Sequence, residues 1–421
     1  MAVATASVAQ ICAGAKRASR ELGMLGAGVK DAALHRIADA LVQRTAEILE
    51  ANQLDLEAGH EAGLSLALID RLTLDDGRIR AMASGVRRIA SLPDPVGEVI
   101  DGFRLPNGLD VLKLRVPLGV VAVIYEARPN VTIDAAALCL KSGNAVVLRG
   151  SSTAAHSNAV LATVASEAAI EAGLPHGALA LVAGGGREAL AELATQNGVV
   201  DLIIPRGGEG LKAALKGVAT VPVIFAASGN CHVYVDASAD LAAAQKIVVN
   251  AKVQRPGVCN AAETLLVHKR IADVFLPRVL HALNDADVTI HGDARTRELL
   301  PDIAVRPARD ADWDTEYLAL EIAVRVVDSV DEAIAHINRH GSGHSEAIVT
   351  SDTAAARQFQ LAVDAACVYV NASTRFTDGG EFGMGAEIGI STQKLHARGP
   401  IGLRELCTTK YLIEGTGHVR P

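Results

Sequence analysis

The hydrophobic positions of the chain follow two different patterns. Between residues 29 and 53 they recur with the period of one helical face, which predicts an amphipathic surface helix. The apolar positions on that face are Leu34, Ile37, Leu41 and Ile48. After residue 118 the pattern changes to short, fully apolar runs that alternate with helix-like stretches. Such runs are typical of parallel strands covered by helices on both faces, so the sequence predicts an α/β fold.

The alternation of strands and helices forms two series. The first has predicted strands at 120–125, 145–148, 178–182, 201–204 and 221–225, with helices at 133–142, 153–171, 187–196 and 209–218. The second has predicted strands at 232–235, 263–267, 288–291, 323–327, 347–350 and 368–371, with helices at 239–251, 271–283, 330–339 and 353–365. A chain of 421 residues is also too long for one ordinary hydrophobic core. We therefore expect two doubly wound parallel-sheet domains.

Two segments fit neither series. Residues 103–114 alternate around Asn107-Gly108, which predicts a β-hairpin, and residues 410–414 predict a lone terminal strand. Neither has an evident partner in its own domain, so we expect a small sheet that a neighbouring chain completes. A surface hairpin without such a role is the alternative. The chain thus divides into a first domain at 1–102 and 118–227, a second at 228–400, and an oligomerisation sheet at 103–117 and 401–421.

Composition narrows the class of protein. Half of the residues are hydrophobic but only 3% are aromatic, which fits closely packed α/β layers. The net charge is −8 without a basic run, so a nucleic acid is not an expected partner. No apolar run approaches the roughly 18 residues of a membrane span, and no signal-peptide pattern follows Met1. The 6 cysteines contain no C-x-x-C pair, which argues against disulfides and zinc and favours the reducing cytoplasm.

One cysteine stands at a position suited to a nucleophile. Cys259 follows the Pro256-Gly257 pair, which breaks regular structure and lets nearby backbone N–H groups meet a developing charge. Arg255 is a cation close enough in sequence to favour the thiolate. Most free cysteines are instead small buried hydrophobic residues. The local turn leaves both interpretations open.

Two strand-to-helix turns could hold a dinucleotide. One is Arg149-Gly150-Ser151-Ser152, where Arg149 could pair with a ribose phosphate, and the other contains Gly207 and Gly208. Neither has the G-x-G-x-x-G spacing, and each alone is more often an ordinary connection between a strand and a helix. Together in one domain they favour a nicotinamide cofactor.

Three histidines recur at helical spacing, as metal ligands often do. His336, His340 and His344 would share one helix face. However, Gly341 and Gly343 interrupt the helix before His344, and no cysteine accompanies the three. We therefore expect no metal and assign these histidines to hydrogen bonding or to the shape of a pocket.

Longer blocks of sequence carry a family resemblance. Tyr125-Glu126-Ala127-Arg128-Pro129-Asn130 follows a predicted strand, and the blocks 327–348, 375–392 and 415–420 are long enough to be specific. With the glycine turns, the Cys259 turn and Thr315-Glu316-Tyr317, they occur in the order of the aldehyde dehydrogenase superfamily, which the chain resembles over nearly its whole length. The resemblance implies that superfamily's fold, with two doubly wound parallel-sheet domains plus a small oligomerisation β-flap.

The resemblance also implies roles for individual residues. Cys259 matches the nucleophile, Asn130 the amide of the oxyanion hole, and Glu316 the carboxylate that holds the nicotinamide ribose. Residues 1–102 and 118–227 would bind NADPH, with Arg149 on its 2′-phosphate, and residues 228–400 would be catalytic. The candidates for the polar ends of an amino-acid substrate, each with a contact inside its own loop as the alternative, are Glu126, Arg128, Ser373 and Arg375.

One departure from the superfamily pattern bears on the reaction. Hydrolytic members carry a glutamate as general base where this chain has Ala226-Ala227-Ser228-Gly229-Asn230. Without a carboxylate to activate water, a thioester exchanges with phosphate instead, which favours a phosphorylating reductase. The resemblance then implies NADPH-dependent reduction of L-glutamyl 5-phosphate, in a homodimer or a dimer of dimers with a functional link to glutamate 5-kinase. An NAD-dependent aldehyde dehydrogenase and a non-catalytic scaffold are the alternatives.

Overall fold

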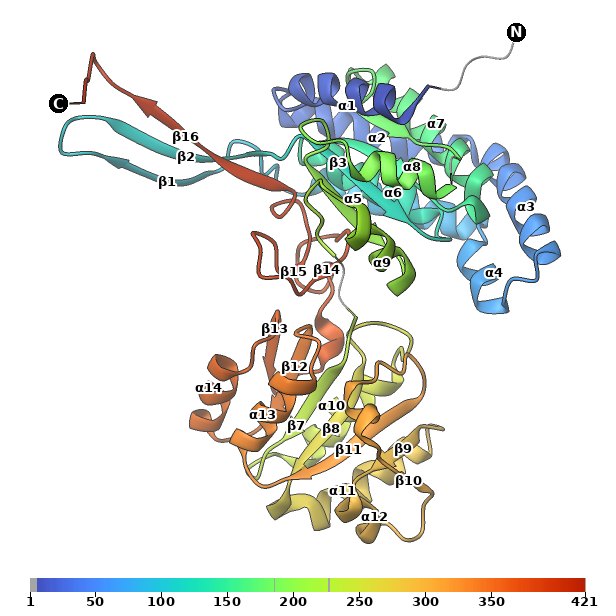
Figure 1. The fold of residues 1–421 in the computed structure, drawn as a ribbon, viewed down its shortest axis with the longest axis vertical. Coiled ribbons are helices and arrows are strands. Elements are labelled where there is room, and N and C mark those ends of the chain that lie inside the picture. The colour runs from blue at the N-terminus through green and yellow to red at the C-terminus, as the bar shows by residue number, and fades with distance from the viewer. Residues whose placement is uncertain (1–5, 185, 226–227, 421) are drawn as a thin grey trace. The chain divides into compact units, whose positions relative to one another are not determined.

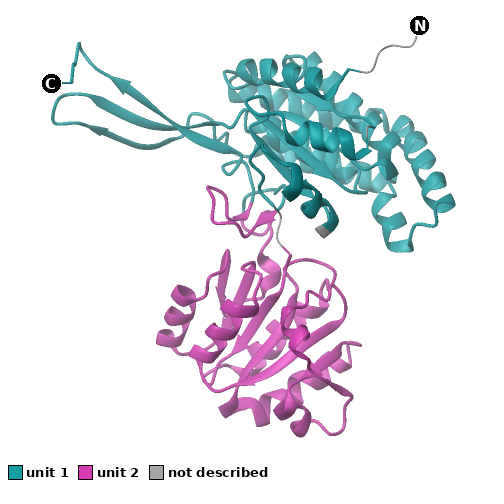
Figure 2. Ribbon diagram, viewed as in Figure 1, with its two compact units in different colours: residues 1–225, 383–389, 401–421 teal, residues 226–382, 390–400 magenta. Residues whose placement is uncertain are grey.

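The structure is a computed structural model of the chain, and it describes residues 6–184, 186–225 and 228–420. The chain forms two compact units, coloured separately in Figure 2. Unit 1 comprises residues 1–225, 383–389 and 401–421, and unit 2 comprises residues 226–382 and 390–400. Each unit therefore contains its own parallel sheet, and the end of the chain returns to the first unit.

Unit 1 is built on a four-stranded parallel sheet in the order β5-β4-β3-β6 (Figure 1). Its strands are β3 (Val120–Tyr125), β4 (Ala145–Arg149), β5 (Leu179–Leu181) and β6 (Leu202–Arg206). Val120, Ala122 and Ile124 lie in the core that includes residues of the first and eighth helices. Tyr125 points to the other face, where its hydroxyl lies 2.7 Å from Oγ1 of Thr132. Both faces are covered, which explains the unbroken apolar run of β3.

The helices of unit 1 lie between Val8 and Val218, and the first five of them precede the strands of this sheet. They are α1 (Val8–Leu22), α2 (Ala27–Gln43), α3 (Thr45–Glu61), α4 (Leu66–Leu72), α5 (Asp76–Ser91), α6 (Asn130–Lys141), α7 (Ala155–Glu171), α8 (Gly186–Ala194) and α9 (Glu209–Val218), with a short 3-10 helix at Ser152–Ala154. None of the helices in the described part of the chain is long and apolar enough to cross a membrane.

Two predicted elements of unit 1 are wrong. The single helix at 29–53 is two helices, because Arg44 has φ −102° and ψ 24° and its guanidinium turns to pair with Glu47 and Glu167. The spacing of the apolar residues is compatible with either arrangement and does not report the break. The strand at 221–225 is reduced to one bridge between Val223 and Ile203, since Pro222 has no N–H to donate to a ladder.

Unit 2 contains a seven-stranded sheet in the order β10-β9-β11-β8-β7-β12-β13, and every neighbouring pair is parallel. Its strands are β7 (Cys231–Val235), β8 (Ala262–His268), β9 (Thr289–Gly292), β10 (Val305–Pro307), β11 (Glu321–Val327), β12 (Ser345–Val349) and β13 (Cys367–Val370). Its helices are α10 (Leu241–Val253), α11 (Lys269–Asn284), α12 (Ala294–Leu299), α13 (Val330–His340) and α14 (Thr353–Ala362), with 3-10 helices at Asp310–Asp314 and Thr374–Phe376. A two-stranded ladder joins β14 (Ile390–Ser391) to β15 (Gly399–Pro400).

The sheet of unit 2 separates two hydrophobic cores. Val233 and Val235 point to the core with α10 and α11, whereas Tyr234 between them points to the core with α13 and α14. This alternation is the two-residue period of a strand whose two faces are both buried. The predicted fold class, an aldehyde-dehydrogenase-like α/β protein with two doubly wound parallel sheets, is therefore confirmed. Strand β10 and helix α12 were not predicted, because each is short.

A separate antiparallel sheet of unit 1 contains the hairpin and the end of the chain. It consists of β1 (Val99–Arg104), β2 (Asp110–Pro117) and β16 (Cys407–Glu414), in the order β1-β2-β16 (Figure 1). The terminal strand pairs with β2 along its whole length, from Cys407 opposite Pro117 to Glu414 opposite Asp110. The predicted small β-flap is confirmed, but the partner of the terminal strand is the hairpin of the same chain rather than a neighbouring one.

Candidate active site

Cys259 lies in the connection from α10 to β8, at the carboxyl side of the Pro256-Gly257 turn. It is half-buried, whereas the other five cysteines are buried. Burial raises the pKa of Cys12 to about 11 and that of Cys407 to about 12, and it raises the pKa of Cys139 and Cys231 as well. The thiol with solvent access is thus the one that the sequence predicted as nucleophile.

The backbone of Gly229 holds the carbonyl of Cys259 in place. A Cβ added to Gly229 would lie 1.5 Å from the Cys259 carbonyl oxygen, so no larger residue fits here without a shift of the backbone. Cys231 donates its thiol proton to the same oxygen at 3.2 Å. Gly229 in turn donates its N–H to Oε1 of Glu316 at 2.6 Å. The predicted ribose carboxylate of Glu316 therefore belongs to the cluster that fixes the backbone of Cys259.

Asn260, the residue after Cys259, links the Cys259 turn to residues 373–377, which contain two predicted substrate residues. Asn260 donates its Nδ2 to the carbonyl oxygens of Thr377, at 2.9 Å, and of Arg375, at 3.3 Å. Thr374 donates its hydroxyl to the carbonyl of Asn260 at 2.7 Å. Ser373 is buried and accepts the N–H of Arg375. Unit 2 thus brings together Cys259, Glu316, Ser373 and Arg375 from three distant parts of the sequence.

The guanidinium groups of Arg255 and Arg375 contribute to the electrostatics of the Cys259 turn. Burial lowers the pKa of Arg375, and so does the charge of Arg255, whereas the charge of an ionised Cys259 raises it. Arg375 donates its Nε to Gln254 at 2.8 Å, which holds it beside the turn. Mutual stabilisation of Arg375 and the thiolate follows from the attraction of opposite charges in a partly desolvated site.

A fully buried ion pair joins α10 and β8, the two elements that flank Cys259. Nζ of Lys252, in the last turn of α10, lies 2.5 Å from Oε2 of Glu263, the second residue of β8. Burial raises the pKa of Glu263 to about 7 and lowers that of Lys252. Oε1 of Glu263 also accepts the N–H of Leu318, two residues after Glu316. The pair therefore fixes the ends of the Cys259 connection relative to the Glu316 segment.

The predicted sites of unit 1 lie where its parallel strands end. Asn130 is exposed and begins α6, and its Nδ2 donates to Oδ2 of Asp134 at 3.0 Å. Arg128 is also exposed, in the short connection from β3 to α6. Glu126 accepts the N–H of Gly208 at 3.0 Å, so a predicted substrate residue and a predicted cofactor turn are in contact. A phosphate at this turn would have to share or displace the Glu126 carboxylate.

The other glycine turn of unit 1 follows β4. Arg149 donates a terminal nitrogen to the carbonyl of Gly186, and its buried Nε has no partner among the described residues. A Cβ on Gly150 would lie 2.0 Å from Nδ2 of Asn158, so the chain must approach closely here. The hydroxyls of Ser151 and Thr153 are 2.5 Å apart, and Ser152 begins the 3-10 helix. Carboxyl ends of parallel strands are where open α/β sheets bind their ligands.

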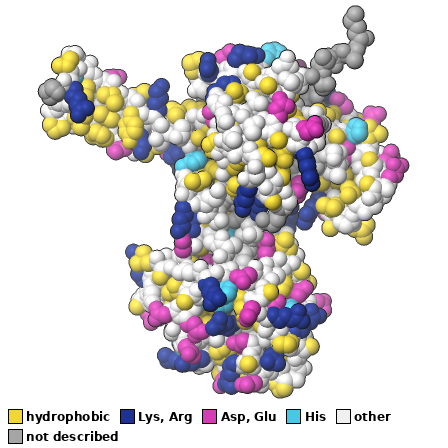
Figure 3. Space-filling view, viewed as in Figure 1, with side chains coloured by type: hydrophobic (Ala, Val, Ile, Leu, Met, Phe, Trp, Pro, Cys, Tyr) yellow, Lys and Arg dark blue, Asp and Glu magenta, His cyan; other side chains and the backbone are white. Residues whose placement is uncertain are grey.

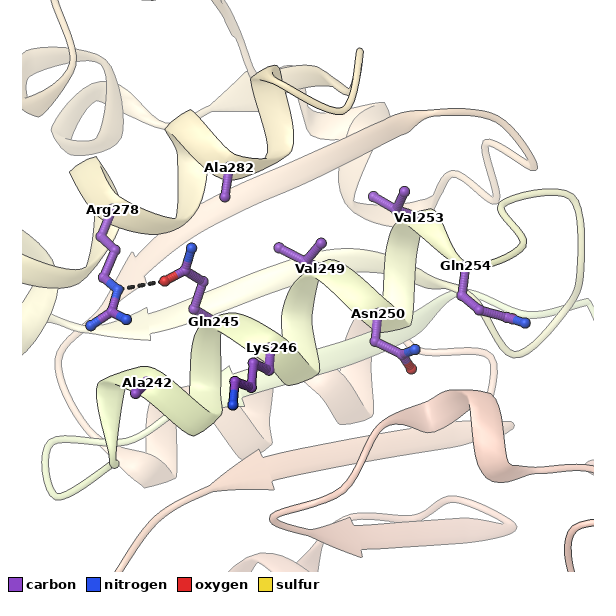
Figure 4. Close-up of a pocket in the computed structure, with 9 residues that line it drawn as sticks. All are labelled: Ala242, Gln245, Lys246, Val249, Asn250, Val253, Gln254, Arg278 and Ala282. Atoms are coloured by element: carbon purple, nitrogen blue, oxygen red, sulfur yellow. Dashed lines mark hydrogen bonds between the residues drawn. The ribbon is translucent and has the colours of Figure 1, made fainter.

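A cavity of about 560 Å³ in unit 2 runs along α10 and is drawn in Figure 4. Gln245 of α10 hydrogen-bonds Arg278 of α11 at one end, and Gln254 lies at the other. Gln254 is the acceptor of Arg375, but neither Cys259 nor any other predicted site residue lines the cavity. The cavity is therefore not the predicted site.

The three histidines have separate hydrogen-bond partners. His336 accepts from Arg325 through Nδ1 at 3.1 Å, His340 lies 2.8 Å from Asp314, and His344 lies 2.8 Å from Ser345. Burial lowers the pKa of His336 to about 2 and that of His344 to about 4, so both are neutral. Within the described ranges, no three His, Cys, Asp or Glu side chains come together in a way that could hold a metal ion. The expectation of no metal stays a prediction.

Comparison with known proteins identifies the class of protein. The model of the aldehyde dehydrogenase family matches residues 1–298 and 313–410, so the chain belongs to that family of nicotinamide-dependent oxidoreductases. The resemblance inferred from the sequence is confirmed.

Within the family, the chain is similar to proteins named gamma-glutamyl phosphate reductase. The relative from Thermobifida fusca is 58% identical over 413 residues, which cover 98% of both chains. The relative from Syntrophomonas wolfei is 57% identical over 406 residues, which cover 96% of both chains. The crystal structure of gamma-glutamyl phosphate reductase from Thermotoga maritima, at 47% identity, superposes with a TM-score of 0.96 over 99% of this chain and 100% of that one.

The contact of Gly229 with the Cys259 carbonyl gives a testable prediction. We expect Gly229→Ala to push the Cys259 segment out of place, to lower the free energy of unfolding by about 1–3 kcal/mol, and to change the rate at which iodoacetamide alkylates Cys259. Gly257→Ala is the matched control, because its Cβ would meet only the carbonyl of Leu318, at 3.6 Å. Similar stability and alkylation rates in the two variants would show that Gly229 does not hold the nucleophile.

Proposed function

We propose that the chain catalyses the NADPH-dependent reduction of L-glutamyl 5-phosphate to L-glutamate 5-semialdehyde and phosphate, the second step of proline biosynthesis from glutamate, through a thioester on Cys259. The observation that carries the proposal is the half-exposed thiol of Cys259, fixed from both sides by Gly229 and Asn260. Full-length similarity to proteins named gamma-glutamyl phosphate reductase supports the choice of substrate.

The first chemical step is assigned to the Cys259 turn and to Asn130. The thiolate of Cys259 attacks the acyl carbon, the acyl oxygen becomes an oxyanion, and phosphate leaves with the electrons of its bond to carbon. The amide of Asn130 and the backbone N–H of Cys259 donate to the oxyanion. One such donor typically contributes roughly 3–4 kcal/mol to lowering the barrier.

The cofactor is assigned to the turns after strands β4 and β6 and to Glu316. Bound NADPH supplies the hydride that reduces the thioester. Arg149 fits a phosphate because its buried Nε has no partner among the described residues. Gly150 lacks a Cβ, which lets the backbone of this turn come close to its neighbours and to a ligand. Ser151, Ser152, Gly207 and Gly208 would complete these turns, and Glu316 would accept from the ribose hydroxyls.

The polar ends of the substrate are assigned to Arg375 and Ser373, together with Glu126 and Arg128. Arg375 uses Nε for Gln254, while its terminal nitrogens donate to no residue in the described part of the chain. A guanidinium with two such nitrogens matches a carboxylate in a bidentate way. Glu126 would accept from the substrate ammonium with the carboxylate that also holds Gly208.

The predicted lack of a general base concerns residues 226–230. Ala226 and Ala227 lie outside the described residues, and the sequence has no Asp or Glu in that segment. A thioester without an activated water persists until hydride or phosphate reacts with it. This property separates the proposed reductase from a hydrolytic NAD-dependent aldehyde dehydrogenase and from a non-catalytic scaffold.

The first prediction from this proposal tests the reaction in its reverse direction. We expect reduction of NADP⁺ with glutamate 5-semialdehyde to require inorganic phosphate, and we expect Cys259→Ala to abolish it because the covalent step is lost. Cys12→Ala, which changes a buried cysteine of α1, is the matched control and should keep most of the activity. Oxidation that proceeds equally without phosphate would support the hydrolytic alternative, and more than a few percent of activity in Cys259→Ala would remove Cys259 from the mechanism.

The second prediction concerns the choice of cofactor. We expect Arg149→Ala to raise the KM for NADPH roughly 10- to 100-fold, since a charge-assisted hydrogen bond contributes about 1.5–3 kcal/mol, and to leave the KM for NADH almost unchanged. Steady-state kinetics with both cofactors measure the difference. An equal increase for NADH and NADPH would mean that Arg149 does not contact the 2′-phosphate.

The proposed enzyme is a homodimer or a dimer of dimers in the cytoplasm that associates through the β-flap, with a functional link to glutamate 5-kinase, which makes its substrate. Apolar side chains are exposed on both faces of the sheet, and Figure 3 shows them gathered on its surface. Phe103 and Ile413 share one face and are 48% and 59% exposed, while Leu112 and Leu412 pair on the other. A three-stranded sheet with two apolar faces is expected to be covered by another chain.

We expect Ile413→Glu to dissociate the assembly, because a charge in a covered apolar face is costly to bury. Thr409→Glu is the matched control, since Thr409 is exposed on the same strand and lies opposite Arg115. Sedimentation velocity should show a monomer for the first variant and the parent assembly for the second. An unchanged assembly in Ile413→Glu would place the interface elsewhere.

A further inference from the structure

The hydrogen bond between Asn130 and Asp134 determines which way the Asn130 amide points. The two residues lie one turn apart on α6, and Nδ2 of Asn130 is 3.0 Å from Oδ2 of Asp134. An ionised carboxylate can only accept, so it holds the NH₂ end of the amide toward itself. The second N–H of that NH₂ group is then available to another acceptor. If the amide turned over, its carbonyl oxygen would face the acceptor's position and repel an oxyanion there.

Asp134 is an unusual residue at its position in α6. From Val131 to Lys141 it is the one helix position that is not buried. Burial raises the pKa of its carboxyl above the usual range, and the hydrogen bond from Asn130 and the charge of Arg206 offset part of that rise. Among the described residues, Asn130 is its one hydrogen-bond donor. A partly buried carboxylate with a single donor is costly to the fold, which points to a role in the site.

Arg206 supplies the positive charge that acts on Asp134. It is the last residue of β6, pairs with Tyr125 of β3, and its carbonyl accepts the N–H of Glu126 at 3.1 Å. Its guanidinium packs against Gly389, where an added Cβ would lie 3.1 Å from NH1 and where φ is 155°. The guanidinium donates to no residue that the structure describes. This contact limits the movement of Arg206, and the guanidinium forms no ion pair at hydrogen-bond distance with a residue that the structure describes.

We propose that Asp134 is a positioning residue that fixes the Asn130 amide for the oxyanion, and that Arg206 is the counter-charge that offsets the Asp134 carboxylate. The proposal rests on the oxyanion role assigned to Asn130. A negative charge directly behind the amide opposes a developing oxyanion, because both carry the same sign in a partly desolvated site. The positive charge of Arg206, which acts on Asp134, offsets that effect while the hydrogen bond keeps its geometry. Asp134 and Arg206 thus act through Asn130 and need not touch the substrate.

The test uses the full-length enzyme and an uncharged acyl donor, p-nitrophenyl acetate, as well as the phosphate-dependent assay. The Cys259 thiolate displaces p-nitrophenolate from this ester and becomes a thioester, so the burst of p-nitrophenolate reports acylation without cofactor or phosphate. The variants are Asp134→Leu, which has no acceptor, Asp134→Asn, whose amide oxygen still accepts, Arg206→Gln, and Asp134→Asn combined with Arg206→Gln. Cys259→Ala measures the release of p-nitrophenolate that comes from acylation of groups other than Cys259.

We expect Asp134→Leu to slow the burst roughly 10- to 100-fold, because a loosely held amide loses part of the effect of an oxyanion donor. The burst rate of Asp134→Asn should stay within about threefold of the parent rate. Arg206→Gln should slow the burst about tenfold, and adding Asp134→Asn should restore most of the rate, because the uncompensated charge is gone. Iodoacetamide alkylation of Cys259 should be unchanged in all variants. In the phosphate-dependent assay, kcat should fall with little change in KM.

Several results would overturn the proposal. A normal burst in Asp134→Leu would show that the amide needs no such partner, and a double variant no faster than Arg206→Gln would remove the counter-charge role. An increase in KM for the charged substrate in Arg206→Gln, with a normal burst, would make Arg206 a substrate ligand instead. The two proposals can also fail separately. If the parent and the variants show the expected bursts but the parent shows no phosphate-dependent reduction, the proposed function is refuted and the role of Asp134 is supported.

Discussion

Backbone contact between Gly229 and the carbonyl of Cys259 determines where the predicted nucleophile can lie. The contact leaves no space for a Cβ on Gly229, and the thiol of Cys231 donates to the same carbonyl oxygen. Through the N–H of Gly229, the contact also reaches Glu316, and through Asn260 the turn reaches Thr374 and Thr377. A nucleophile in a loop gains the precision of the sheet when its backbone is held in this way.

The second constraint on the site is a buried ion pair. Lys252 and Glu263 carry no exposed surface, and the desolvation of such a pair commonly offsets most of its attraction. Their effect is geometric, because they join the end of α10 to the start of β8 on either side of the nucleophile. In unit 1, Asp134 lies one turn after the start of α6, and the charge of Arg206, the last residue of β6, acts on it. Each unit thus retains costly charges in elements that carry or flank a predicted catalytic residue.

The sequence predicted those parts of the fold that depend on local pattern. Unbroken apolar runs such as 120–125 identified the parallel strands, and Asn107-Gly108 identified the hairpin. The Pro256-Gly257 turn identified Cys259. In contrast, the contact of Gly229 with Cys259 and the effect of Arg206 on Asp134 join residues that are distant in sequence, and no periodicity predicts them. Only the four-residue spacing from Asn130 to Asp134, one helical turn, could have suggested that pair in advance.

The position of β16 has a consequence for biosynthesis. Its partner β2 leaves the ribosome early, but Cys407 and the residues of β16 are made much later, so roughly 15–60 s of synthesis at about 5–20 residues/s separates the two strands. During that time the edge of β2 is unpaired, while the continuous segment of unit 2, which ends at residue 382, can already fold. The last strand of the chain therefore closes an edge that the nascent protein has exposed throughout translation, which makes this edge the natural place for a chaperone to act or for aggregation to begin.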